Sequence, residues 1–375
     1  MRLDEARARL AAEMERRGDW PERAPWIRAA VAATPRDEFA PERLWRWEGD
    51  GYAPVDRAVD EDAWGSLVYA GPDDATVTRV VDAVPTSSLS CQAVVVDMLD
   101  SLLLQPGHRV LELGTGTGWN AALAARRAGP GNVVSVEIDP ESAEGARKAL
   151  AIAGLDVRVE VGDGAAGCPS QRPWERVIST YAVERVPWSW IARTTPGGRV
   201  VTPWGRLGHV ALTVADDGRS AQGWVQGLAT FMPARGTPPE RRFADLRGGA
   251  APEQKRGSVR DLAPLCDDAH LLFALRVALP EVRVRATRDV DGVSAWVHDG
   301  DTSWAAYSAA ARGPTTLCQG GPRRLGDELE TAWDRWSAAG SPGLYDHGMT
   351  VTPETQYVWT HDPDTGPRWP TKAKV

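Results

Sequence analysis

The stretch RVLELGTGTGWNAALAARRAG, residues 109–129, decides the fold of this chain. It opens with a short apolar run, which predicts a buried strand, and passes through three alternate glycines into an alanine-rich segment, which predicts a helix. Glycine lets the backbone approach a ligand without a Cβ in the way. In sheets built from such units, ligands bind beyond the carboxyl ends of the strands. The stretch therefore predicts a ligand-binding turn.

The alternation of strand and helix continues from about residue 105 to residue 200. It predicts an α/β fold with a doubly wound, Rossmann-like parallel sheet and right-handed crossovers. We expect a catalytic domain over residues 1–236, with helices in its first 75 residues and loops over residues 50–85. We expect a smaller α+β domain over residues 237–375, joined by a charged, glycine-rich linker at residues 244–258.

Within that second domain, the segment RLGDELETAWDRWSAAG predicts an amphipathic helix. Helical spacing puts five apolar side chains on one face of it. They are Leu325, Leu329, Ala332, Trp333 and Trp336.

Composition argues against several classes of function. The 375 residues include 43 Lys and Arg against 51 Asp and Glu, a net charge of -8, whereas nucleic-acid binding relies on clustered cations. No apolar stretch is long enough to span a bilayer. The 4 cysteines form no CxxC pair, which argues against a structural metal site or a disulfide framework. We therefore expect a cytoplasmic protein without nucleic-acid, membrane or metal partners.

The residues after the glycines distinguish three cofactors. A phosphate-binding P-loop needs Gly-Lys-Ser/Thr, but Gly118 is followed by Trp119 and Asn120. A dinucleotide fingerprint needs a third glycine where Trp119 stands. The remaining interpretation is S-adenosylmethionine (SAM), because ELGTGTG fits the E/D-x-G-x-G-x-G loop of SAM-binding enzymes.

The next two strands support SAM binding. One ends in Glu137, which can accept hydrogen bonds from both ribose hydroxyls, as an acid does at a similar place in dinucleotide enzymes. The other ends in Asp163, which can accept from the adenine amino group, while Gly164 leaves room for the ring. Either acid taken singly is as well explained as a solvated loop carboxylate. Their occurrence at consecutive strand ends with the glycine loop favours SAM.

Several ordered blocks resemble the protein-L-isoaspartate O-methyltransferase family. They are the segment TSSLSCQAVVVDML before the glycine loop, TPRDEFAP at residues 34–41, VGDGAAG, PGGRVVTPWG and FMPARG. The resemblance covers residues 30–236. Cys91 and Gln92 depart from the small residue and proline that usually follow the Ser-x-Ser of the family, and Tyr181 departs from its Thr- or Ala-rich loop.

The C-terminal segment, residues 304–363, is similar to that of actinobacterial relatives that mature ribosomally made peptides, beside graspetide ligases or lanthipeptide enzymes. This resemblance implies methylation of an aspartate in a precursor peptide, expected to be macrocyclised first. The ester would then yield an aspartimide or, after hydrolysis, isoaspartate. Two alternatives stay open: repair of isoaspartyl sites in damaged proteins, and a non-catalytic peptide-binding partner of a maturation complex.

The resemblance also implies roles for residues. Ser90 is expected near the transferring methyl and the acceptor carboxylate as a hydroxyl donor, although Ser88 and Ser90 could equally cap the following helix. An aspartate acceptor is ionised at neutral pH, so no general base is needed. Tyr181, Thr202, Pro203 and Trp204 are expected to line the peptide cleft. The expected cofactor-binding residues are Ser88, Glu112, Gly114, Thr115, Gly116, Thr117, Gly118, Asn120, Glu137, Ile138, Asp163, Gly164 and Thr180.

Overall fold

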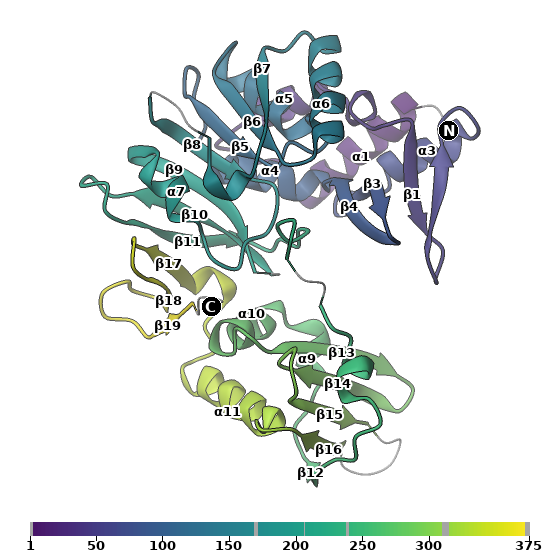
Figure 1. Cartoon of the computed structure of the whole chain (residues 1–375), viewed down its shortest axis with the longest axis vertical. Helices are drawn as coiled ribbons and strands as arrows, with labels where there is room; N and C mark the ends of the chain where they lie inside the picture. Colours follow the sequence, from purple (N-terminus) through teal and green to yellow (C-terminus); the bar gives the residue numbers. More distant parts are fainter. Residues whose placement is uncertain (1–2, 169–171, 206, 238–239, 310–314, 372–375) are drawn as a thin grey trace. The chain divides into compact units, whose positions relative to one another are not determined.

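The computed structural model describes residues 3–168, 172–205, 207–237, 240–309 and 315–371. The chain divides into two compact units (Figure 1). The N-terminal unit holds residues 1–234 together with 351–354, and the C-terminal unit holds residues 235–350 and 355–375. Among the helices in the described ranges, none is long and apolar enough to cross a membrane.

The N-terminal unit is built on the predicted α/β sheet, with strand order β11-β10-β9-β8-β5-β6-β7. Strands β9, β8, β5, β6 and β7 pair in parallel, β10 pairs antiparallel with β9, and β11 pairs antiparallel with β10. The strands are β5 (Val110–Leu113), β6 (Val133–Glu137), β7 (Val157–Val161), β8 (Trp174–Ser179), β9 (Thr194–Trp204), β10 (Gly208–Val214) and β11 (Ala221–Gly227). The helices beside them are α4 (Gln92–Ser101), α5 (Trp119–Ala128), α6 (Pro140–Ile152), α7 (Trp188–Ala192) and the 3-10 turn η2 (Gly164–Ala166).

Small residues let α5 and α6 pack closely on the strands. Most of α5 is buried, and its many alanines bring its backbone near β6. At its start, an ideal Cβ on Gly118 would lie 3.3 Å from the Cβ of Ala146 in α6. The glycine-loop helix therefore has little freedom to move, which fixes the turn before it.

The N-terminal region contains more strand than expected. A four-stranded antiparallel sheet, with order β2-β1-β3-β4, occupies the part that the sequence suggested was helix and loop. The β3–β4 turn places Asp82 and Ala83 at φ values of 49° and 62°. Such turns usually carry glycine, so the hairpin lacks its ordinary sequence signal. The elements are α1 (Leu3–Arg17), α2 (Trp26–Ala32), η1 (Arg36–Glu38), β1 (Arg43–Trp47), β2 (Tyr52–Asp56), α3 (Glu61–Val68), β3 (Thr76–Val81) and β4 (Val84–Leu89).

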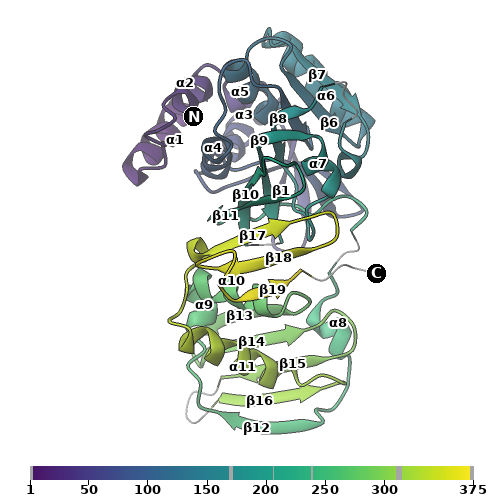
Figure 2. The same ribbon diagram turned by 90° about the vertical axis from the view of Figure 1, so that its left-hand side faces the viewer.

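The C-terminal unit has a hydrophobic core of its own. Apart from β17–β19, its strands form a separate sheet. Strands β12, β16, β15, β14 and β13 form an antiparallel sheet in that order, and α11 packs on it beside α10 (Figure 2). The predicted face of α11 is confirmed: Leu325, Leu329 and Trp333 are buried, and the other two residues are partly buried. The elements are α8 (Phe243–Arg247), β12 (Gln254–Ser258), α9 (Pro264–Asp267), α10 (Ala269–Ala278), β13 (Arg283–Asp289), β14 (Gly292–His298), β15 (Trp304–Ser308), β16 (Thr315–Gly320), α11 (Leu325–Ala338), η3 (Leu344–Asp346), β17 (His347–Val351), β18 (Gln356–Thr360) and β19 (Arg368–Pro370).

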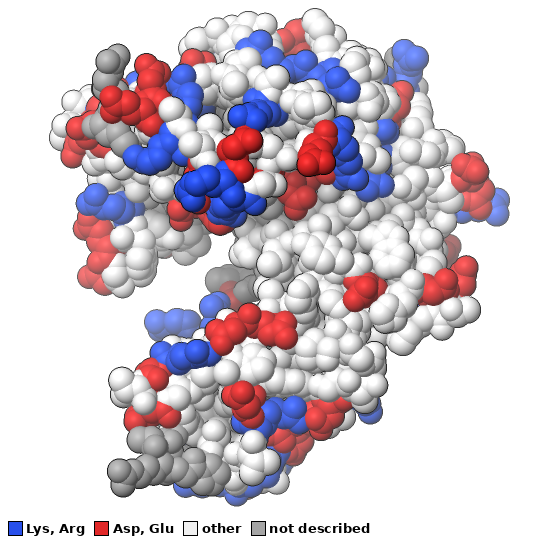
Figure 3. All heavy atoms as spheres, turned by 180° about the vertical axis from the view of Figure 1, so that it is seen from behind, with Lys and Arg blue, Asp and Glu red and all other residues white. Residues whose placement is uncertain are grey.

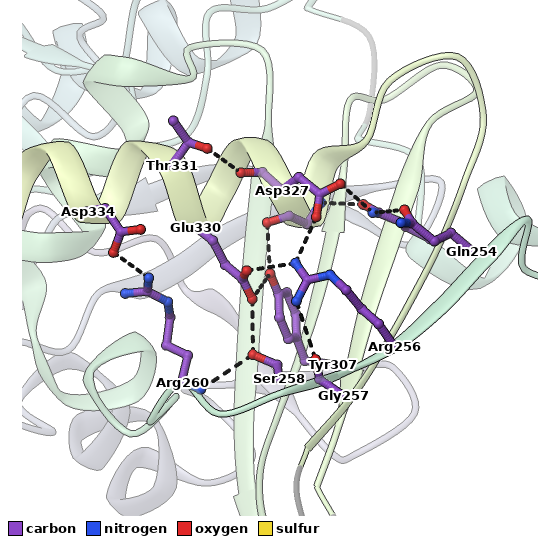
Figure 4. A network of polar contacts seen from close by, with 12 residues as sticks. Gln254, Arg256, Gly257, Ser258, Arg260, Tyr307, Asp327, Glu330, Thr331 and Asp334 are labelled. Carbon is purple, nitrogen blue, oxygen red and sulfur yellow. Dashed lines mark hydrogen bonds and ion pairs between the residues drawn. The ribbon is translucent and has the colours of Figure 1, made fainter.

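The expected linker at residues 244–258 is wrong, because this segment folds as α8 and the edge strand β12. A polar network ties β12 to α11 (Figure 4). The Arg256 guanidinium lies 2.7 Å from Asp327 and 2.7 Å from Glu330, and the Ser258 hydroxyl donates to Glu330. Charges that looked like those of a solvated linker are therefore paired with helix residues about 70 positions later.

We predict that Arg256→Met loosens β12 locally. The change leaves the partly buried Glu330 without its cation, which should cost about 1–2 kcal/mol, because the pair is only partly screened by solvent. Hydrogen exchange of β12 peptides, followed by mass spectrometry, should become faster. Arg288→Met is the matched control, because Arg288 pairs with Asp267 while both side chains are exposed. Equal exchange in both variants would show that the network does not hold the edge strand.

Candidate active site

The predicted turn lies where β5 ends and α5 begins. Gly114, Gly116 and Gly118 have φ values of 93°, 53° and 87°, in the left-handed region that favours glycine. An ideal Cβ on Gly114 would lie 2.5 Å from Thr180 Oγ1 and 2.9 Å from Tyr181 Cδ1. The turn is therefore shaped both by backbone conformation and by side chains that follow the neighbouring strand β8.

Glu112 supports this turn from beneath. Its side chain is fully buried, and its carboxylate accepts hydrogen bonds from Asn120 Nδ2 at 2.7 Å and from the Ser135 hydroxyl. Thr115 is also buried, with its hydroxyl 2.6 Å from that of Ser135. Burial raises the pKa of Glu112 to about 7. Because Glu112, Thr115 and Asn120 are occupied with one another or with Ser135, we assign them to the framework of the turn.

Glu137 joins the end of β6 to the same turn. One carboxylate oxygen accepts the Gly116 backbone N–H at 2.9 Å, and the other accepts the Asp139 N–H at 3.1 Å. The next residue, Ile138, leaves 44% of its surface exposed although it is a large apolar side chain. A carboxylate beside an exposed apolar surface suits a ribose and an adenine ring.

The third strand end carries Asp163 and Gly164. Asp163 is exposed, and one of its oxygens accepts the Ala165 N–H at 2.9 Å. An ideal Cβ on Gly164 would lie 2.6 Å from the Tyr181 hydroxyl, so a larger residue there would displace that ring. Trp190 supports both groups, since its indole N–H donates to the Gly164 carbonyl at 2.8 Å and its ring meets that of Tyr181 edge-on.

Tyr181 thus lies between two of the predicted cofactor glycines. Its ring reaches from Gly114 to Gly164, and burial raises the pKa of its hydroxyl. Thr180 adds to the same contact by donating its hydroxyl to the Gly114 carbonyl. The structure therefore groups Tyr181 with the predicted cofactor residues.

Ser88 and Ser90 lie at and just after the end of β4. The Ser88 carbonyl oxygen would lie 3.9 Å from an ideal Cβ on Gly116, so this strand runs past the glycine turn. Neither serine caps α4: Cys91 holds the N-cap position, without a side-chain hydrogen bond. The capping interpretation is therefore wrong. Within the described residues the Ser90 hydroxyl has no hydrogen-bond partner, and its side chain is half-buried.

Thr202, Pro203 and Trp204 at the end of β9 are all buried. The Thr202 hydroxyl donates to the Pro203 carbonyl, and the Trp204 indole donates to the Glu184 carbonyl at 3.1 Å. Their burial argues against direct contact with a substrate. We assign them instead to the support of the loop that follows Tyr181.

Two arginines that the sequence reasoning did not single out hold these elements together. Arg36 is buried and donates to the Ser90 carbonyl at 2.7 Å and to the Val68 carbonyl at 3.3 Å. Arg79 of β3 pairs with Asp139 and Glu141 at the start of α6. Arg36 belongs to the motif TPRDEFAP, so the sequence could have indicated it. Arg79 belongs to none of the motifs quoted above.

Comparison with known proteins identifies the family of the N-terminal unit. The family model for protein-L-isoaspartate(D-aspartate) O-methyltransferase matches residues 22–233. Protein-L-isoaspartate O-methyltransferase 1 of Anaeromyxobacter sp. (strain Fw109-5) is 36% identical over 219 residues, 58% of this chain and 88% of the relative. The corresponding protein of Anaeromyxobacter dehalogenans (strain 2CP-1) is 45% identical over 154 residues, 40% of this chain and 71% of the relative.

The chain belongs to the protein-L-isoaspartate O-methyltransferase family. It is a SAM-dependent carboxyl methyltransferase with the predicted fold. A solved protein-L-isoaspartate O-methyltransferase shares that fold at 21% identity with a TM-score of 0.54, covering 95% of this chain and 100% of its own. The likeness of fold therefore extends past residue 233, where the family model ends.

We predict that Glu137→Gln weakens binding of S-adenosylhomocysteine. The amide keeps the size of the side chain but removes the charge that a ribose diol and the Gly116 N–H would share, at a cost of about 1–3 kcal/mol. Isothermal titration calorimetry measures the affinity for S-adenosylhomocysteine. Glu144→Gln is the control, because Glu144 lies on the exposed side of α6. Unchanged affinity in Glu137→Gln would mean that Glu137 is not the ribose ligand.

We predict that Gly114→Ala abolishes measurable binding in the same titration. A Cβ there would meet Thr180 and Tyr181 while the backbone kept a left-handed conformation, which alone costs about 1–3 kcal/mol. Gly145→Ala is the matched control: it lies in α6, has open space around it, and should stabilise the helix by about 0.5–1 kcal/mol. Normal binding by Gly114→Ala would refute the close approach of a ligand to this turn.

Proposed function

We propose that this enzyme methylates an aspartate carboxylate in a ribosomally made precursor peptide, and that the C-terminal unit recognises the peptide. The observation that supports this is a second folded unit, with its own core, after the part that the family model matches. The resemblance of residues 304–363 to biosynthetic relatives from actinobacteria, an expectation from the sequence, belongs to the same proposal. A cytoplasmic location, where SAM and a precursor peptide would meet, belongs to the same proposal.

The residues at the strand ends fit the cofactor. Gly114 and Gly116 leave backbone surface that a Cβ would fill, Ile138 offers exposed apolar area, and Glu137 and Asp163 offer carboxylate acceptors. When bound, SAM supplies an electrophilic methyl group on a sulfonium. The chain's own part is to hold the donor on β5, β6 and β7 and to exclude water from the reacting atoms.

Ser90 is the proposed catalytic residue. Its hydroxyl is uncommitted within the described residues, and its backbone is fixed by the buried Arg36. In the proposed mechanism it donates a hydrogen bond to one oxygen of the acceptor carboxylate and leaves the other oxygen to be methylated. The acceptor is already ionised at neutral pH, so catalysis depends on position, which can supply several kcal/mol.

The C-terminal unit would supply binding energy away from the reacting atoms. Such remote energy can be used to place the carboxylate. A macrocyclised peptide loses less conformational entropy on binding than a linear one. For this reason we propose that the preferred substrate is cyclised before methylation.

A second candidate function is repair of isoaspartyl residues. The matching family and its relatives carry that name. A solved protein of the same name covers 95% of this chain, so a chain longer than the matched region does not by itself indicate biosynthesis. In repair, the acceptor would be the α-carboxylate of isoaspartate, which lies where a normal aspartate presents its side chain.

The two functions are separated by incubating the enzyme and SAM with two substrates: the cognate precursor, linear and macrocyclic, and an isoaspartyl peptide of unrelated sequence. We expect the macrocyclic precursor to gain one methyl group. It should then lose methanol, leaving a peptide one water lighter than at the start. Mass spectrometry follows both steps, and Ser90→Ala should slow the first without changing S-adenosylhomocysteine affinity. Methylation of the isoaspartyl peptide alone would refute the biosynthetic proposal and support repair.

A further inference from the structure

The C-terminal unit contains a small pocket of about 180 Å³. One wall is the segment 240–243, and the other is Arg285 of β13 with Trp296 and His298 of β14. Arg285 and Trp296 are direct neighbours across the two strands. The volume suits one side chain and is well below that of an ordinary cofactor site.

His298 gives the lining of this pocket a hydrogen-bond donor. Only 3% of the surface of His298 is exposed, and its Nδ1 accepts the Gly300 N–H at 3.2 Å. Burial holds the pKa of His298 below its ordinary value, so at neutral pH the ring carries one proton, on Nε2. Among the described residues, Nε2 has no hydrogen-bond partner. A donor that lacks a protein partner and lines a pocket favours a ligand that accepts a hydrogen bond.

Arginines surround the same space. The Glu240 carboxylate forms ion pairs with two arginines: its oxygens lie 3.3 Å from Arg283 Nε and 3.3 Å from Arg285 Nη2. The Arg285 side chain is 72% exposed and so keeps further donors available. Arg241 donates one hydrogen bond, to the Asp301 carbonyl at 2.9 Å. Cationic donors thus outnumber the single carboxylate of the lining, which favours an anionic ligand, and the small volume suits the carboxylate of one side chain.

We propose that this pocket, the His298 pocket, binds the carboxylate of a glutamate or aspartate side chain of the polypeptide substrate, at a position other than the methylated residue. The carboxylate receives hydrogen bonds from His298 Nε2 and from Arg285 or Arg241, and its methylene groups lie against Trp296. The inference rests on the proposed function only in taking a polypeptide as the ligand. It assigns the C-terminal unit a preference for acidic peptides.

The test uses the full-length chain and two fluorescein-labelled octapeptides without an acceptor aspartate. One contains four glutamates, and the other contains four glutamines at the same positions. Fluorescence anisotropy should show at least tenfold tighter binding of the glutamate peptide. Arg241→Gln and Arg285→Gln lie at the surface and should each reduce that preference at least threefold. Arg288→Gln removes the same charge from β13 outside the pocket lining and should leave it unchanged.

Equal binding of the two peptides would overturn the proposal, as would an equal loss in Arg288→Gln, which would indicate general charge attraction. S-adenosylhomocysteine affinity, measured on every variant, checks that the N-terminal unit is intact. If the glutamate preference holds while no precursor is methylated, the proposed biosynthetic function fails and the pocket stands. If a precursor is methylated without any glutamate preference, the proposed pocket fails and the proposed biosynthetic function stands.

Discussion

The narrow space around Gly114 is the constraint on which the site depends. Thr180 and Tyr181, which follow β8, occupy the space that a Cβ on Gly114 would need, and the Thr180 hydroxyl donates to the Gly114 carbonyl. On the next strand, Glu137 accepts the Gly116 N–H. The carboxyl ends of three adjacent parallel strands are therefore connected through one turn. Because the connections use backbone groups, the geometry depends on the absence of a Cβ at Gly114 and on the carboxylate at position 137.

The sequence was sufficient for the parts that local rules determine. The glycine turn, the acids at the strand ends and the apolar face of α11 each follow from spacing within one element. The N-terminal hairpin was missed because Asp82 and Ala83 make its turn without glycine. The strand β12 was taken for a linker because its Arg256 pairs with Asp327 and Glu330, far along the chain. Such pairs become visible only when the elements are assembled.

The sequence pattern also could not predict which residues of the site are buried. Glu112 and Thr202 stand in motifs that suggest ligand contact, yet both are fully enclosed by protein. At the end of a strand, alternate residues point to opposite faces, and only the assembled structure tells which face a helix covers. Arg36 shows the converse. It belongs to the motif TPRDEFAP, and its buried guanidinium joins that motif to Ser90 and to the ring of Trp119, 4.8 Å away.

The distribution of charge around the turn indicates how an anionic acceptor can be tolerated there. Three acids lie at the strand ends, which suits a cationic cofactor but would repel a second carboxylate. Glu112 is protonated more easily than usual, since burial raises its pKa to about 7. Glu137 is balanced by two backbone N–H groups, and Asp163 by one.

The β4 side of the turn is different. That side carries the uncommitted hydroxyl of Ser90 and the buried cation Arg36, which donates to the Ser90 carbonyl. Burial lowers the pKa of Arg36 only to about 10, so it stays charged at neutral pH. On the face shown in Figure 3, acidic and basic side chains are interspersed and form no single basic stripe. Because the whole chain carries a net charge of -8, local donors and not a general positive field must attract the substrate carboxylate. An approach past Ser90 meets a hydroxyl donor in place of a strand-end carboxylate, which is the physical reason for placing the acceptor on that side of the turn.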